Sequence, residues 1–203
     1  MAMSKTKDHI IDVASRLMHL RGYNYTSVND VLKESGVGKG NFYYYFRSKE
    51  ELGYAIIESN LRRFSDHVLE RAFGNHKDAL TQVDDFLDMI LELQRQRNCA
   101  GGCPMGSMAM EMSDIHEGFR KKFQEVFEGW RRQVAGALQR AKAAGQLSDD
   151  LEPTRLAQFV IAGVEGGVLL MKVKKDIKIL ESCFKELKNH IRMYVSHDVI
   201  YSD

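Results

Sequence analysis

Five aromatic residues follow one another at positions 42–46 of this 203-residue chain, and the middle three are tyrosines. A helix turns by about 100° per residue, so one apolar stripe can hold Phe42 and Phe46 but not the tyrosines between them. Phenol groups are then left facing outward, where their hydroxyls can donate to phosphates and their rings can pack against sugars. Tyr43, Tyr44 and Tyr45 therefore indicate a contact with nucleic acid, although Tyr45, beside a buried Phe46, fits half-buried packing equally well.

Polar residues on both sides of this aromatic run favour the same chemistry. Lys39 and Asn41 lie at the start of the helix, the end that points toward base edges when a helix enters the major groove, and Gly40 lets the backbone approach closely. Lys49 lies in the first turn of the next helix, where a phosphate would offset the repulsion between a cation and the helix dipole. The alternative is that Lys39 and Lys49 are ordinary solvated lysines that contact no DNA. The predicted DNA contacts are Thr26, Ser27, Lys39, Gly40, Asn41, Tyr43, Tyr44, Tyr45 and Lys49.

Methionine and cysteine are concentrated in a second segment, NCAGGCPMGSMAMEMSD at residues 98–114. Methionine lines adaptable apolar cavities, so this segment and nearby aromatic residues predict a site for a small apolar ligand. Ordinary core packing remains the alternative for each single residue. The predicted ligand-binding residues are Met89, Leu93, Cys103, Met105, Met108, Met112, Phe123, Phe127, Trp130, Phe159 and Met171.

Cys103 has a more specific chemical setting than the other two cysteines. It directly precedes Pro104, a favoured first residue of a helix, so its sulfur is expected near free backbone amides that stabilise a thiolate. Such a thiol reacts readily with oxidants and electrophiles. A small buried hydrophobic side chain is the alternative for any cysteine.

The sequence gives little evidence for a metal site, a cofactor site or a catalytic site. Cys99 and Cys103 are four residues apart, but no second Cys/His pair follows at zinc-finger spacing, so we expect no metal and no cofactor. The sequence contains no P-loop, no glycine-rich dinucleotide turn after a strand and no nucleophile elbow. We therefore expect a binding protein and not an enzyme, with a thiol-dependent enzyme as the rival class.

Helical periodicity and the presence of only two prolines predict an all-α fold. A short helix is expected from residue 38 through the tyrosines. The other expected helices span about 5–21, 27–35, 48–73, 76–97, 104–112, 115–143, 153–173 and 176–196. Ser27 and the capping box from Ser48 to Glu51 mark two of the starts.

Two short helices joined by a tight turn at Ser35, Gly36 and Val37 form the helix-turn-helix pattern. We expect a three-helix DNA-binding domain at residues 1–50 and a larger helical ligand-binding and dimerisation domain at residues 51–203. Charge supports this division, because residues 1–49 contain eight Lys/Arg and four Asp/Glu while the whole chain has a net charge of +1. A signal peptide and a long uninterrupted apolar run are lacking, which predicts a cytoplasmic protein without a membrane partner.

Apolar residues recur at helical spacing along the last two expected helices. Two such stripes can bury each other, and doubling them across a two-fold axis would form a four-helix dimer interface. Closing the core of a single protomer is the alternative, because periodicity alone does not distinguish the two. The predicted interface residues are Leu156, Val160, Gly163, Gly167, Ile177, Leu180, Phe184, Leu187 and Ile191.

Residues 26–52, TSVNDVLKESGVGKGNFYYYFRSKEEL, resemble the DNA-binding domain of the TetR family of bacterial transcriptional regulators. The similarity rests on Thr26, Asp30-Val31, Gly36-Val37, Lys39-Gly40, the run from Tyr43 to Phe46 and the Ser-Lys-Glu-x-Leu continuation. It implies a homodimer that binds a palindromic double-stranded DNA operator, mostly as a repressor, and leaves it when an unknown small molecule binds the C-terminal domain. A DNA-binding organiser without a small-molecule inducer is the alternative.

The C-terminal part is similar to an electrophile-responsive subgroup of that family, whose namesake responds to N-ethylmaleimide. The similarity rests on the Gly-Cys segment, on Glu-x-Ser-Asp at residues 111–114 and on Lys172. It implies that Cys103 and Lys172 are candidates for a redox or electrophile response.

Overall fold

We describe a computed structural model of the chain over residues 5–74 and 77–196. Apart from a single isolated β-bridge, the regular structure in these residues is helical, which confirms the all-α prediction. The chain divides into two compact units. The first contains the residues up to Phe64 together with Pro104–Phe123, and the second contains Ser65–Cys103 and the chain from Gln124 onward.

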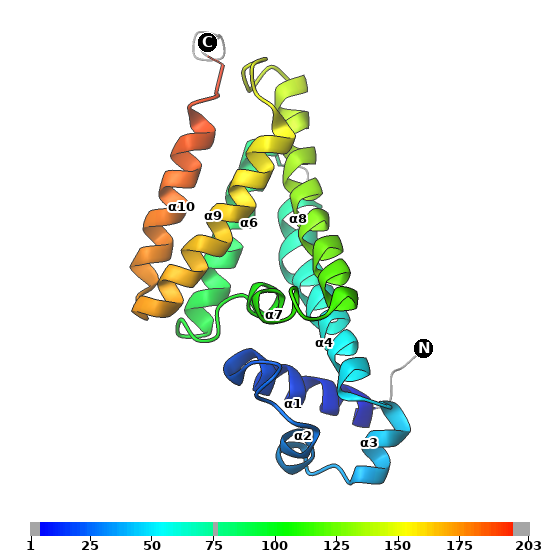
Figure 1. Ribbon diagram of the computed structural model, residues 1–203. Coiled ribbons are helices and arrows are strands. Elements are labelled where there is room, and N and C mark those ends of the chain that lie inside the picture. Colours follow the sequence, from blue (N-terminus) through cyan, green and yellow to red (C-terminus); the bar gives the residue numbers. More distant parts are fainter. Residues whose placement is uncertain (1–4, 75–76, 197–203) are drawn as a thin grey trace. The chain divides into compact units, whose positions relative to one another are not determined.

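The first unit contains α1 (Lys5–Arg21), α2 (Val28–Ser35), α3 (Lys39–Tyr45), α4 (Lys49–Phe64), α7 (Pro104–Met112) and the first turns of α8 (Glu117–Ala143). Figure 1 shows α2 and α3 on the same side of α1. Ile10, Val31, Phe42 and Leu52, one from each of the first four helices, are fully buried and form the core of this small domain. Burial of these side chains supplies most of its stability.

Local sequence signals set the helix ends in this unit. Ser27 caps α2 through a reciprocal pair of hydrogen bonds with Asp30, and Gly36 ends α2 in the left-handed conformation, with φ of 67°. The Ser48 hydroxyl accepts a hydrogen bond from the backbone N–H of Glu51 at 3.1 Å, as a capping box requires. The helix that the sequence predicts from 48 to 73 is helical throughout, but a π-helical turn at Ser65–Leu69 separates α4 from the short α5 (Glu70–Phe73).

The second unit packs α6 (Ala79–Gln96), the rest of α8, α9 (Pro153–Lys174) and α10 (Ile177–Arg192) around a core that includes Leu87, Leu138, Val160 and Phe184. Residue 76, where the sequence places the start of α6, lies outside the described residues. α9 and α10 lie side by side along their lengths (Figure 1). By length and composition α9 could cross a membrane, but its packing against α10 is that of a core helix.

α10 is shorter than the predicted 176–196, because the residues after Arg192 pair with the connection between α8 and α9. Ser148 donates its backbone N–H to the carbonyl of Tyr194 at 2.7 Å, and Ser196 donates to the carbonyl of Gln146 at 3.1 Å. These bonds take the backbone out of the helix and satisfy its polar groups in another way.

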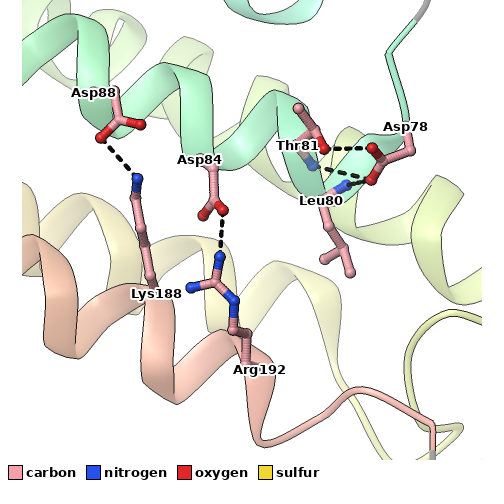
Figure 2. A network of polar contacts seen from close by, with 7 residues as sticks. All are labelled: Asp78, Leu80, Thr81, Asp84, Asp88, Lys188 and Arg192. Carbon is pink, nitrogen blue, oxygen red and sulfur yellow. Dashed lines mark hydrogen bonds and ion pairs between the residues drawn. The ribbon is translucent and has the colours of Figure 1, made fainter. Parts of the chain in front are cut away.

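Charged side chains join α10 to α6 on the surface of the second unit (Figure 2). Lys188 pairs with Asp88 at 2.7 Å and Arg192 pairs with Asp84 at 2.5 Å. Asp78 caps the start of α6 by accepting hydrogen bonds from the backbone N–H groups of Leu80 and Thr81. Exposed ion pairs contribute little to stability individually.

Candidate nucleic-acid interface

The aromatic run on α3 divides between the protein interior and the surface. Phe42 and Phe46 are 0% and 1% exposed, whereas Tyr44 is 81% and Tyr43 47% exposed. Tyr45 is half-buried, and its ring meets that of Tyr44 edge to face with centroids 4.8 Å apart. The two phenylalanines anchor α3 to the small core, and the phenols of Tyr43 and Tyr44 face outward.

The first turn of α3 presents further polar groups beside these phenols. Lys39, Gly40 and Asn41 are all exposed. A Cβ atom added at Gly40 would have no atom within 4 Å, so packing within the chain does not explain why this position is glycine. Glycine inside a helix costs about 1 kcal/mol relative to alanine, and the open space beside Gly40 leaves room for a partner to approach the backbone.

Thr26 and Ser27 serve the structure of the turn before α2. Thr26 is fully buried and its hydroxyl donates to the carbonyl of Gly22 at 2.8 Å. A buried, satisfied hydroxyl cannot reach a phosphate, so Thr26 supports the site from within instead of contacting DNA. Ser27 is exposed, but its hydroxyl and its N–H are both bonded to Asp30, and these bonds lower the pKa of Asp30.

Lys49 points toward Tyr23 in the same unit. Its Nζ atom lies 4.3 Å from the centroid of the Tyr23 ring, close enough for a cation–π interaction. Burial lowers the pKa of Lys49, and the nearby Glu111 and Asp30 oppose that change. Burial raises the pKa of Tyr23 to about 12, with smaller contributions from Glu50, Tyr54 and Glu111. The ammonium of Lys49 thus has partners within the protein.

Glu111 is a residue whose role sequence reasoning missed. Its carboxylate accepts hydrogen bonds from the backbone N–H groups of Tyr23 at 2.8 Å and Asn24 at 2.5 Å, in the turn between α1 and α2. The contacts span 88 and 87 residues of sequence. The Glu-x-Ser-Asp pattern drew attention to this glutamate, but nothing in the sequence indicated its partners.

The predicted ligand-binding residues are distributed over both units. Met105, Met108, Met112 and Phe123 are buried in the first. The others belong to the second, where Trp130 and Met171 are buried and the Trp130 ring meets Phe127 with centroids 5.1 Å apart. Met89 and Leu93 are half-buried on α6. Phe159 is 50% exposed and lies against His190, which places it on the outer surface of the helical unit.

Cys103 is half-buried and shares a hydrogen bond with the carboxyl group of Glu165 on α9. Burial raises the pKa of that carboxyl group, which the bond to Cys103 partly offsets. Lys172 passes beside the preceding residue, because a Cβ atom added at Gly102 would lie 3.2 Å from its Cδ atom. The structure thus brings Cys103, Glu165 and Lys172 into one neighbourhood of the second unit.

The residues predicted as a dimer interface pack against one another within one chain. Val160 and Leu180 are fully buried, Phe184 is 2% exposed, and Leu156, Leu187 and Ile191 are also buried. A Cβ atom added at Gly167 would lie 3.0 Å from Leu180. Ile177 is half-buried at the start of α10. Side chains buried in this way have little surface left for a second protomer, so the stripes close the core of one chain.

The outer face of α9 is apolar instead. Phe159, Leu169, Leu170 and Val173 are between 46% and 70% exposed, and Ala162 and Gly166 between them are exposed as well. Their spacing of three or four residues places them along one side of the helix. A stripe of this kind on a water-facing helix is typical of a surface that another protein covers.

Two family models match the chain. Residues 10–56 match "Bacterial regulatory proteins, tetR family", and residues 79–187 match "Tetracyclin repressor-like, C-terminal domain". The first match covers α2, α3 and their turn, and the second covers most of the helical unit.

Individual proteins are similar over nearly the whole chain. An HTH-type transcriptional regulator from the lacX 3′ region of Lactococcus lactis is 34% identical over 186 residues, 92% of this chain and 93% of that protein. The crystal structure of the regulatory protein TetR from Rhodobacter sphaeroides is 30% identical, covers 92% of this chain and 99% of its own, and has a TM-score of 0.86.

The HTH-type transcriptional repressor NemR of Escherichia coli is a third relative. It is 26% identical over 189 residues, which are 92% of this chain and 94% of that protein. The crystal structure of its reduced form has a TM-score of 0.82 at 25% identity and covers 92% of this chain and 96% of that one.

Proposed function

The chain belongs to the TetR family of transcriptional regulators, and on that basis we propose that it is a repressor that binds a palindromic DNA operator as a homodimer. It is a regulator and not an enzyme. The observation that carries the DNA-reading part of the proposal is the exposure of Tyr44 beside the buried Phe42 and Phe46. A helix anchored by two phenylalanines can present its phenols and Lys39 to the major groove without losing its own packing.

The geometry of recognition follows from the two-fold symmetry of the proposed dimer. Two copies of α3 would enter successive major grooves about 34 Å apart, so the operator would be a palindrome with half-sites one helical turn apart. Lys39, Asn41 and Tyr44 are the side chains proposed to contact base edges or phosphates. Tyr43 lies on the same helix and is exposed as well.

The dimer interface is proposed on the outer face of α9. This face combines Phe159, Leu169, Leu170 and Val173, which water covers in the isolated chain. Pairing them across a two-fold axis would remove an apolar stripe from water, and Gly166 allows two backbones to come close. The packed pair of α9 and α10 would then meet its symmetry copy as a four-helix arrangement.

The effector is proposed to be a small apolar or electrophilic molecule. Cys103 is the partly exposed thiol proposed to react with it; the carboxyl group of Glu165 shares a hydrogen bond with this thiol, and the side chain of Lys172 passes beside the neighbouring Gly102. A cation near a thiol favours the reactive thiolate. The hydrogen bond shared with Glu165 holds the sulfur in place. The alternative is a DNA-binding organiser without an inducer. Either protein would act in the cytoplasm, where its DNA is.

The experiment that tests this proposal is selection of genomic fragments by the purified full-length chain at low salt, followed by fluorescence anisotropy on the enriched sequence. We expect a palindromic fragment to be retained and to dissociate as salt rises, because phosphate contacts release counterions. Failure to enrich any sequence would overturn the proposal. If the protein retains a DNA fragment but no apolar or electrophilic compound releases it from that fragment, the result would favour the DNA-binding organiser without an inducer.

A further inference from the structure

Glu111, near the end of α7, holds the turn that leads into the DNA-reading helices. Its two carboxylate oxygens accept the backbone N–H groups of Tyr23 and Asn24, at 2.8 and 2.5 Å. Three residues after Asn24, Ser27 begins the cap of α2. A single side chain from α7 therefore fixes the backbone immediately before the helix-turn-helix.

The turn is shaped to receive this carboxylate. Gly22 has φ of 99°, a conformation that favours glycine, and a Cβ atom there would lie 3.1 Å from Oε2 of Glu111. Any larger residue at position 22 would push the carboxylate away. From the other side, the buried hydroxyl of Thr26 bonds to the carbonyl of Gly22 at 2.8 Å. The backbone of the turn is thus held both by Glu111 and by its own Thr26.

Electrostatics support the same contact. Lys49, at the start of α4, places its ammonium 4.3 Å from the Tyr23 ring, and Glu111 is the largest of the charges that favour the protonated form of this lysine. Hydrogen bonds between a carboxylate and backbone N–H groups are stronger than those between neutral groups. Glu111, Tyr23 and Lys49 thus join α7, the α1–α2 turn and α4 at one point.

Other contacts of the segment that follows α7 are made with α4. His116 pairs with Glu50 at 3.3 Å, and the ring of Phe119 packs against Tyr54 with centroids 4.6 Å apart. Lys122 pairs with Glu58. These contacts keep residues 104–123 in the first unit without Glu111, so removal of its carboxylate should change the turn and leave the unit folded.

We propose that Glu111 is a positioning residue for DNA recognition, through which α7 sets the conformation of the turn that precedes α2 and α3. This inference rests on the proposed function, because it assigns the regulation of that same DNA-reading surface. α7 begins directly after Cys103 in the sequence. A chemical change at Cys103 could therefore move α7, and with it the carboxylate of Glu111 that holds the turn. A movement of α7 that withdraws the carboxylate would release two backbone amides beside the cap of α2.

The test compares Glu111→Ala and Glu111→Gln with Asp114→Ala in operator binding. Asp114 is exposed and belongs to the same segment, so its replacement removes an identical charge without removing the contact with the turn. Loss of a negative charge alone should strengthen DNA binding equally in all three variants. A positioning role predicts the opposite for Glu111→Ala, whose operator affinity should be roughly fivefold or more weaker than that of the wild type. Glu111→Gln should have an affinity between those of the wild type and Glu111→Ala, because one side-chain oxygen remains to accept a hydrogen bond. Equal affinities for Glu111→Ala and Asp114→Ala would overturn the proposal.

Hydrogen exchange of the free protein provides a readout that needs no operator. The amides of Tyr23 and Asn24 should exchange roughly tenfold faster or more in Glu111→Ala, while buried amides of α4 keep their wild-type rates. Unchanged exchange at both amides would contradict the contact itself. If wild-type protein binds no operator while these amides respond as expected, the proposed function fails and the contact with the turn stands. If exchange rises throughout the first unit, Glu111 is a general stability residue and its positioning role is refuted.

Discussion

Gly163 on α9 lies directly beneath Leu187 on α10, so that a Cβ atom added at Gly163 would come within 2.7 Å of Cδ2 of the leucine. The neighbouring atoms are a branched side chain that is itself 6% exposed and has little room to move. This contact fixes how closely the two helices approach, and it explains why glycine stands inside a long helix.

Gly163→Ala should therefore destabilise the chain although alanine is the better helix former. Overpacking a close helix contact costs about 1–3 kcal/mol, which outweighs the gain of about 1 kcal/mol in helix propensity. Gly129→Ala on α8 is the matched control, because a Cβ atom there meets nothing within 4 Å and only the gain remains. Urea unfolding measures both free energies. A stabilised Gly163→Ala variant would show that α9 and α10 are not packed so closely.

Sequence signals predicted the local structure well because their causes are local. Ser27, Gly36 and Ser48 act on backbone groups a few residues away, and Pro104 starts α7 as expected. The outward phenols followed in the same way from the angle between successive residues on a helix. These features require no knowledge of which distant helices meet.

The remaining features depend on contacts between segments far apart in sequence. The apolar stripe through Val160 and Leu180 has the same periodicity whether it faces α10 of its own chain or a second protomer, so spacing could not assign it. Glu111 is one acidic residue among 28 Asp and Glu, and its partners are backbone amides that have no sequence signature. Thr26 matched a family motif, but only its burial shows that it supports the turn from within.

Lys39→Ala and Tyr44→Ala should each weaken operator binding roughly tenfold, since a base or phosphate contact is worth about 1–3 kcal/mol. Both side chains are exposed, so neither change should lower the melting temperature. Lys39→Ala should also reduce the slope of log affinity against log salt by about one if the lysine contacts a phosphate. Lys185→Ala, an exposed lysine on α10, is the control and should retain wild-type affinity. Wild-type affinity in both α3 variants would contradict the assignment of α3 as the reading helix.

N-Ethylmaleimide should release the protein from its operator through Cys103. Alkylation adds a bulky group beside Glu165, directly before the first residue of α7. Operator affinity of the wild type should fall on treatment, and Cys103→Ser should abolish this effect. Cys183→Ser is the matched control, because Cys183 is also half-buried and lies on α10, and this variant should still respond. Complete alkylation of Cys103, verified by mass spectrometry, with unchanged affinity would rule out the sensor role.

Leu170→Asp should convert the dimer to a monomer and abolish operator binding together. Leu170 is 52% exposed in the single chain, so aspartate there costs little in the monomer, whereas a two-fold interface would bury the charge beside its symmetry copy. Ile115→Asp, at a 67% exposed residue of the first unit, controls for the loss of an exposed apolar side chain and should remain dimeric. Leu180→Asp distinguishes core from interface: Leu180 is fully buried between α9 and α10, so this variant should fail to fold instead of forming a folded monomer. Sedimentation velocity gives the oligomeric state, and a Leu170→Asp variant that stays dimeric would remove the interface from this face of α9.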